Sequence, residues 1–350
     1  MKTNVSTCPA TSQGDEAATG AVASPFAVVA LDVGGTKIGG AIVRYETRDA
    51  MPTVLLSRAV PTQAKRGGAV VTQTICDTAR QLLADAESCP ELEGCPIVGV
   101  GVGTAGRVDA QTGAIAYAND IMPGWMGQPL GDRLKEACGL PVAVMNDVQA
   151  HGLGEARHGA AAGSHTCIMV AVGTGLGGTL VFEGRIMGGA HGFAGELGCS
   201  LHPMAGNVSC EGGITGRLES IASGSGIERC YRAGGGEALS GPEISARAAE
   251  GERLARRVIE QAGYSLGESI ISWANIFDPD LVVISGSVCK SGPLWREALR
   301  RGMEAQMTSA VRGLRVVDAS LGANAPLLGA AENLLDRLEP REPRVAALRR

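Results

Sequence analysis

The stretch FAVVALDVGGTKIGGAIV, residues 26–43, predicts the unit on which the fold is built. Two β-prone apolar runs flank a Gly-Gly pair, which is typical of a strand, a tight turn and a second strand. A similar stretch, CIMVAVGTGLGGTLVF, occupies residues 167–182 and carries its own glycine turn. The repetition suggests an internal duplication in which each half opens on a glycine-turn hairpin. Two unrelated tight turns are the simpler alternative.

Strand-like and helix-like segments alternate through the rest of the chain. The predicted strands are 97–103, 141–147 and 281–287, and the predicted helical regions are 68–86, 148–158, 244–275 and 325–338. Strands that alternate with helices indicate an α/β architecture.

The composition limits the classes of protein that the chain can belong to. With 350 residues, the chain is too long for one typical core, so two domains are expected. No apolar run approaches the ~20 residues that a membrane-spanning helix needs. The formal net charge of −5 argues against broad binding to nucleic acid or to acidic membranes.

The ten cysteines and the N-terminal segment bear on the cellular compartment. Residues 1–24 are rich in Ser, Thr, Ala and Gly, contain no secretory apolar region, and are predicted to be a disordered tail. Cysteines scattered through a chain of this size, without a secretory signal, are typical of reduced thiols. A cytoplasmic protein is therefore expected.

The glycine turns are candidate phosphate-binding sites. Gly173, Gly175 and Gly178 match the spacing of the dinucleotide fingerprint, but that match is rejected because β-prone residues follow, where the fingerprint needs a helix. A turn of this kind can still present backbone N–H groups to a phosphate. Thr36, Lys37 and Thr174 would add hydroxyl or ammonium donors.

Two aspartates stand at the ends of predicted strands. Asp32 directly precedes the first turn, where it would repel phosphates unless a cation such as Mg²⁺ lay between them. A turn-capping role is the alternative for Asp32. Asp147 ends the strand at 141–147 and is a candidate general base, although it could also cap the helix that follows.

In order along the chain, these motifs resemble the ROK family (repressors, open reading frames and kinases) over about residues 26–335. The matching segments are 31–37 and 172–178 for the two phosphate motifs, Asn146-Asp147 for the catalytic pair, 189–198 for the glycine-rich sugar motif, 218–224 for the last sugar-binding glutamate and 284–287 for the adenosine motif. The family belongs to the actin-like ATPase superfamily. The resemblance therefore implies a duplicated ribonuclease-H-like fold of two lobes, with the active site in the cleft between them.

The resemblance also implies domain boundaries and a role for each matching residue. The expected parts are an N-terminal lobe at 25–147, a C-terminal lobe at 148–320 and a terminal helix at 321–340 that packs back on the N-terminal lobe. Asp147 would be the general base and Asp32 would hold Mg²⁺ with ATP. The implied sugar-binding residues are Arg107, Asn119, Asn146, Glu196, Cys199 and Glu219. The implied ATP-binding residues are Gly34, Gly35, Thr36, Lys37, Gly173, Thr174, Gly175 and Gly286.

The sequence departs from the family pattern near a structural zinc site. The family has a His that contacts sugar and zinc where this chain has Cys199, and of three zinc-binding cysteines only Cys210 is in place. Tetrahedral structural zinc needs four N or S ligands. His202 could be a third ligand or could replace the missing sugar contact, but a surface position is favoured. The sequence therefore predicts that zinc is absent.

The resemblance favours a sugar kinase that uses ATP, acts in the cytoplasm and forms a homodimer. A ROK repressor is disfavoured because too few residues precede residue 26 for a DNA-binding module, and a non-catalytic sugar sensor is disfavoured because the catalytic motifs are intact. Segments 106–108 and 146–150 resemble N-acetylmannosamine kinases, so N-acetylmannosamine is the first choice of substrate. Glucose and other hexoses remain alternatives.

Overall fold

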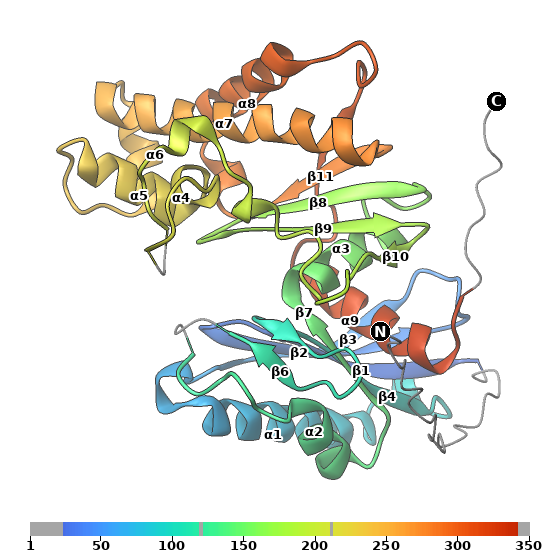
Figure 1. The fold of residues 1–350 in the computed structure, drawn as a ribbon. Coiled ribbons are helices and arrows are strands. Elements are labelled where there is room, and N and C mark those ends of the chain that lie inside the picture. The colour runs from blue at the N-terminus through green and yellow to red at the C-terminus, as the bar shows by residue number, and fades with distance from the viewer. Residues whose placement is uncertain (1–23, 119–121, 211–212, 342–350) are drawn as a thin grey trace, which may run out of the picture.

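A computed structural model describes residues 24–118, 122–210 and 213–341. The chain forms two lobes, each built on a five-stranded sheet (Figure 1). The first sheet has the order β3-β2-β1-β4-β7. Its strands are β1 (Phe26–Val33), β2 (Lys37–Tyr45), β3 (Thr53–Pro61), β4 (Ile97–Thr104) and β7 (Val142–Asn146).

The second sheet repeats this topology. Its order is β10-β9-β8-β11-β12. Its strands are β8 (Thr166–Val172), β9 (Leu176–Phe182), β10 (Arg185–Ile186), β11 (Leu281–Ser285) and β12 (Arg315–Asp318). In both sheets the first three strands pair antiparallel and the last two add in parallel. The predicted α/β fold with an internal duplication is therefore confirmed.

Helices cover both sheets. The first lobe carries α1 (Gly68–Ala86) and α2 (Leu130–Cys138), and between the lobes lie α3 (Asp147–His158) and α9 (Ala325–Leu338) (Figure 1). The second lobe carries α4 (Glu219–Ala222), α5 (Gly224–Ala233), α6 (Gly241–Ala249), α7 (Arg253–Phe277) and α8 (Pro293–Gln306). A small hairpin of β5 (Arg107–Val108) and β6 (Ile115–Tyr117) follows β4.

The continuous apolar run of β1 is explained by cover on both faces of its sheet. Leu31 belongs to an apolar cluster with Ile75 of α1, whereas Val28 belongs to one with Leu328 of α9. The two helices between the lobes pack very closely, because a Cβ added to Gly329 would lie 1.7 Å from the carbonyl oxygen of Ala150. This packing fixes α3, and with it the start of that helix, against the first sheet.

The other sequence predictions have mixed outcomes. The tail at 1–24 lies almost entirely outside the described residues, and the boundaries at 147/148 and 320/321 remain predictions. No helix in the described ranges is both long and apolar enough to cross a membrane. The nine cysteines in the described ranges are free thiols.

Candidate active site

Four carboxylates from distant parts of the sequence gather where the lobes face each other. Asp32 lies near the end of β1, Asp147 begins α3, Glu196 precedes a short 3₁₀ turn and Glu219 begins α4. Burial raises the pKa of Glu196, and the nearby charges of Glu219 and Asp147 raise it further. The fold therefore concentrates negative charge in a partly desolvated site, which is typical of a functional centre.

Asp32 is a partly buried carboxylate with a strongly raised pKa. Its pKa is raised from 3.8 to about 6, because burial and the nearby charge of Asp147 raise it more than the charge of Lys37 lowers it. A cation beside Asp32 would relieve both the burial and the repulsion. Carboxylate oxygen is a ligand that Mg²⁺ prefers, so the residues present fit the magnesium ion that the sequence predicts.

The start of α3 corrects one alternative from the sequence. The N-cap is Asn146 and not Asp147, because the Asn146 side-chain oxygen accepts hydrogen bonds from the backbone N–H groups of Val148 (2.9 Å) and Gln149 (3.2 Å). The Asn146 side-chain amide also donates to the carbonyl oxygen of Gly106 at 3.0 Å. Only one amide hydrogen of Asn146 is left for a ligand.

Asp147 is thereby released from capping and occupies the first turn of the helix. Burial raises its pKa, while hydrogen bonding, including a 2.9 Å bond from the backbone N–H of Val148, opposes that shift. The positive end of the helix dipole also favours the ionised form. The result is a buried carboxylate whose affinity for a proton is higher than that of an ordinary aspartate.

Both glycine turns are anchored through their carbonyl groups. In the first turn, the hydroxyl of Thr62 donates to the carbonyl oxygen of Gly34 at 2.6 Å. In the second turn, the N–H groups of Gly224 and Ser225 donate to the carbonyl oxygens of Gly173 and Thr174 at 2.8 and 3.1 Å. With the carbonyls held in this way, the turns keep a fixed shape.

Glu219 supports the second turn in a way that the sequence did not predict. Its carboxylate accepts a hydrogen bond from the backbone N–H of Leu176 at 2.9 Å. A Cβ at Gly175 would lie 2.8 Å from the same carboxylate oxygen, so a side chain there would displace the Glu219 carboxylate. This predicted sugar-binding residue therefore braces the second glycine turn.

Gly286 lies beside the strand that leads into the second turn. Its φ is 106°, and a Cβ there would lie 2.3 Å from the carbonyl oxygen of Val172. Both facts exclude a side chain at position 286 without movement of the backbone. Its place, next to the second turn, is where the predicted adenosine residue is expected.

Protein contacts hold the region where the family has its zinc site and this chain keeps Cys199 and Cys210. Cys199 is exposed, and Cys210 is buried and donates its thiol to the carbonyl oxygen of Ile214 at 3.3 Å. His202 is buried, with Nε2 3.3 Å from a carboxylate oxygen of Glu268, so the expected surface position is wrong. In the described ranges, no group of three or more His, Cys, Asp or Glu side chains is placed to hold a metal ion. The absence of zinc stays a prediction.

Arg107 is engaged by the opposite lobe, and Asn119 lies outside the described residues. The Arg107 guanidinium donates to the carbonyl oxygen of His191 at 2.9 Å and lies 4.5 Å from the ring centre of Phe193. Both partners belong to the segment before Glu196. Arg107 therefore bridges the two lobes, and its sugar-binding role stays a prediction.

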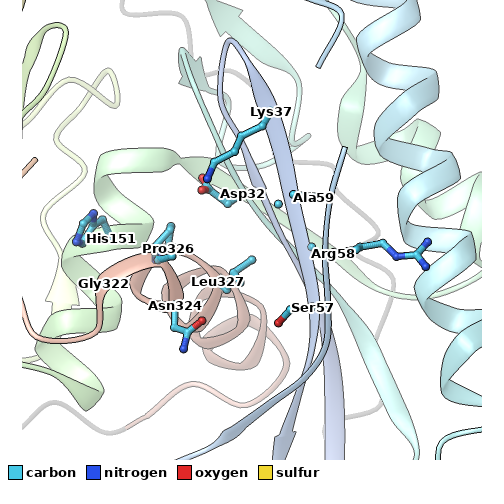
Figure 2. A pocket seen from close by; sticks show the side chains of 13 residues that line it. Asp32, Lys37, Ser57, Arg58, Ala59, His151, Gly322, Asn324, Pro326 and Leu327 are labelled. Atoms are coloured by element: carbon cyan, nitrogen blue, oxygen red, sulfur yellow. The ribbon is translucent and has the colours of Figure 1, made fainter. Parts of the chain in front are cut away.

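A pocket of about 530 Å³ opens beside the first turn (Figure 2). It is lined by Asp32, Lys37, Gly39, Gly40, Ser57, Arg58, Ala59, His151, Gly322, Ala323, Asn324, Pro326 and Leu327. Lys37 points toward Asp32, and Arg58 extends away from the pocket toward Asp85, with which it forms an ion pair at 2.6 Å. The residues that line the pocket come from the strands around the first turn and from the region of α3 and α9 between the lobes.

His151 is a pocket residue that the sequence reasoning missed. It lies four positions after Asp147, so both side chains share one face of α3. Its Nε2 is buried and has no hydrogen-bond partner in the described part of the chain, and burial lowers its pKa. The helical spacing from Asp147 was the signal that could have found it.

The chain is similar in sequence and in structure to known proteins. The sequence profile of the ROK family matches residues 28–337. The chain is 31% identical over 310 residues to a glucokinase of Halalkalibacterium halodurans, covering 84% of this chain and 92% of that protein. It is 32% identical over 309 residues to the bifunctional enzyme NanE/NanK of Brucella melitensis, covering 87% and 53%. A ROK family glucokinase of Streptomyces griseus, solved with glucose and AMPPNP, aligns with a TM-score of 0.69 and 27% identity, covering 87% and 98%.

Proposed function

Because the chain belongs to the ROK family, we propose that it is an ATP-dependent sugar kinase that phosphorylates the 6-hydroxyl of a hexose or N-acylhexosamine. The observation that carries this proposal is the placement of Asp147. Its buried carboxylate stands at the start of α3, close enough to Asp32 to raise the pKa of that group. A base and a candidate magnesium ligand thus share one cleft.

Asp147 would take the proton from the attacking hydroxyl. A hydroxyl is a weak nucleophile, and a positioned general base typically contributes about 10²–10⁴-fold in rate. The raised pKa of Asp147 suits this role, because a more basic carboxylate accepts a proton more readily. Because Asn146 caps α3, the Asp147 carboxylate is not needed as the cap, and beside the bond that it accepts from Val148 it can face the acceptor.

The two glycine turns would hold the phosphates of ATP. Phosphoryl transfer depends on positioning and on neutralising charge, and backbone N–H groups in anchored turns supply both. Lys37 would add a positive charge beside the first turn. Asp32 would hold Mg²⁺, which when bound neutralises phosphate charge.

The acceptor is proposed to be N-acetylmannosamine, with glucose as the alternative. The segments 106–108 and 146–150 favour N-acetylmannosamine, and the relative of the NanE/NanK type is consistent with it. The glucokinase relatives, one of them solved with glucose, support glucose equally well. Glu196, Glu219 and the remaining amide hydrogen of Asn146 would bind sugar hydroxyls.

An ADP-release assay with a panel of hexoses tests the proposal. Sugar-dependent ADP release is expected, with the largest kcat/KM for N-acetylmannosamine. A preference of tenfold or more for glucose would replace N-acetylmannosamine as substrate. Absence of release with every hexose would contradict the kinase activity itself. We also propose that the protein is cytoplasmic and forms a homodimer. Measurement of its molecular mass in solution tests the homodimer.

A further inference from the structure

The two lobes are joined at one side of the cleft by a small cluster of side chains. Arg107 of β5 and Tyr117 of β6 belong to the hairpin that follows β4 of the first lobe. His191 and Phe193 belong to the second lobe, in the loop between β10 and Glu196. The Arg107 guanidinium lies over the Phe193 ring, 4.5 Å from its centre, and the ring centres of Tyr117 and Phe193 are 6.1 Å apart.

Each end of this cluster leads to a residue of the proposed reaction. On the first lobe, the Asn146 side chain donates to the carbonyl oxygen of Gly106, the residue directly before Arg107. On the second lobe, the backbone N–H of Glu196 donates to the carbonyl oxygen of Phe193 at 3.3 Å. One unbroken set of contacts therefore runs from the start of α3, across the cleft, to Glu196.

The aromatic members of the cluster are too exposed to serve the core. Tyr117 is 51% exposed and Phe193 is 43% exposed, so both residues leave a large part of their surface open to solvent. Gly192 has a φ of 71° and turns the loop toward Arg107, so that a Cβ there would lie 3.5 Å from two side-chain carbons of that arginine. The loop backbone is shaped to bring these side chains together. Contacts among exposed side chains can form and break without unfolding of either lobe.

We propose that Arg107, Tyr117 and Phe193 form an interlobe latch, which fixes the position of Glu196 relative to Asp147. The three side chains are positioning residues: they act through Asn146 and Glu196 and need not touch the sugar. The proposal rests on the sugar kinase function for its kinetic effects. The latch itself can be tested in the ligand-free protein.

Substitution of one latch residue should impair use of the sugar and spare use of ATP. Phe193→Ala is expected to lower kcat/KM for the sugar about tenfold, the scale of a lost cation–π contact and of a slightly misplaced acceptor. The KM for ATP is expected to stay within about twofold, since the glycine turns do not contact the latch. Equal losses on the sugar and ATP sides would contradict the latch.

A double-mutant cycle separates a latch from a direct sugar contact. If Arg107 acts only through Phe193, Arg107→Ala combined with Phe193→Ala loses no more activity than the more damaging single change. If Arg107 binds the sugar itself, the two losses multiply and the Arg107→Ala loss differs between glucose and N-acetylmannosamine. That second outcome would overturn the proposal.

Hydrogen exchange supplies a measurement that does not depend on activity. In the ligand-free protein, Phe193→Ala should speed amide exchange in the hairpin at 105–117, which belongs to the other lobe. Phe182→Ala is the matched control, because Phe182 is 47% exposed and lies outside the cluster. Its ring centre is 5.1 Å from that of His165. Unchanged exchange at 105–117 in Phe193→Ala, or equal changes in both variants, would overturn the latch even if no sugar were phosphorylated.

Discussion

The two sides of the cleft are held by different kinds of contact. On the side of the glycine turns, carbonyl groups of the turns accept hydrogen bonds from Thr62, Gly224 and Ser225. Gly286 beside the second turn has no room for a side chain, because the carbonyl oxygen of Val172 would lie 2.3 Å from its Cβ. On the opposite side, the lobes meet through the exposed side chains of Tyr117 and Phe193. The proposed ATP side is thus preformed, whereas the proposed sugar side can adjust. Substitutions should therefore damage chemistry on the first side and selectivity on the second.

The largest effect should follow removal of the residue on which both sides converge. Asp147→Ala is expected to lower kcat by about 10²–10⁴-fold, because the acceptor hydroxyl loses its base. Binding of sugar, measured by calorimetry, should persist. A near-normal kcat would remove Asp147 from the mechanism.

The next effect concerns the pH dependence of stability on the ATP side. The pKa of Asp32 in the folded protein, about 6, lies above the ordinary value of 3.8. The corresponding stability is complete below pH 3.8 and is lost as the pH rises through 6. At about 1.4 kcal/mol per pH unit, the loss is about 3 kcal/mol. Asp32→Asn in magnesium-free protein should therefore be more stable than the wild type at pH 8 but not at pH 4.

Urea unfolding of both proteins at the two pH values measures this difference. Magnesium with nucleotide should reduce the advantage of Asp32→Asn at pH 8, because bound cation stabilises the ionised carboxylate. An equal stability gap at pH 4 and pH 8 would contradict the proposed origin of the raised pKa.

A glycine pair compares the rigidity of the two sides directly. Gly286→Ala should lower the free energy of unfolding by about 1–3 kcal/mol, because its φ is 106° and its Cβ would meet the carbonyl of Val172. Gly188→Ala lies in the loop of the adjustable side, where a Cβ would meet nothing within 4 Å. Its effect should stay within about 0.5 kcal/mol. Equal effects in denaturant unfolding would remove the contrast between the sides.

The smallest expected effect concerns metal removal on the sugar side. His202 contacts Glu268, and Cys210 bonds to a backbone carbonyl, so protein contacts hold this region. Dialysis against a chelator should leave Tm unchanged. Metal analysis that found about one zinc per chain would overturn this expectation.

The sequence was sufficient for features that depend on local pattern. The hairpin at 26–43, its repeat at 167–182 and the strand predicted at 141–147 follow from apolar runs and glycine turns, and the structure contains each of them, the last as Val142–Asn146. The position of Asp147 at the start of a helix follows from the same pattern.

Features that depend on contacts between distant segments could not be predicted. Local pattern could not tell that Asn146 would cap α3 in place of Asp147, because the two neighbours are both good capping residues. The brace from Glu219 to Leu176 joins segments 43 positions apart, and the bond from Arg107 to His191 joins segments 84 positions apart. His202 was expected at the surface because the sequence around it does not indicate that it contacts Glu268, which lies 66 positions later in the chain.

The most direct test of the central claim is to follow product formation by Asp147→Asn and the wild type with magnesium, ATP and each hexose. The isosteric amide keeps the shape of the site but cannot accept the proton. Phosphorus NMR should detect a sugar 6-phosphate formed in step with ADP by the wild type, and a rate reduced by about 10²–10⁴-fold in the variant. ADP formation without sugar phosphate in the wild type, or equal rates in the two proteins, would contradict the account.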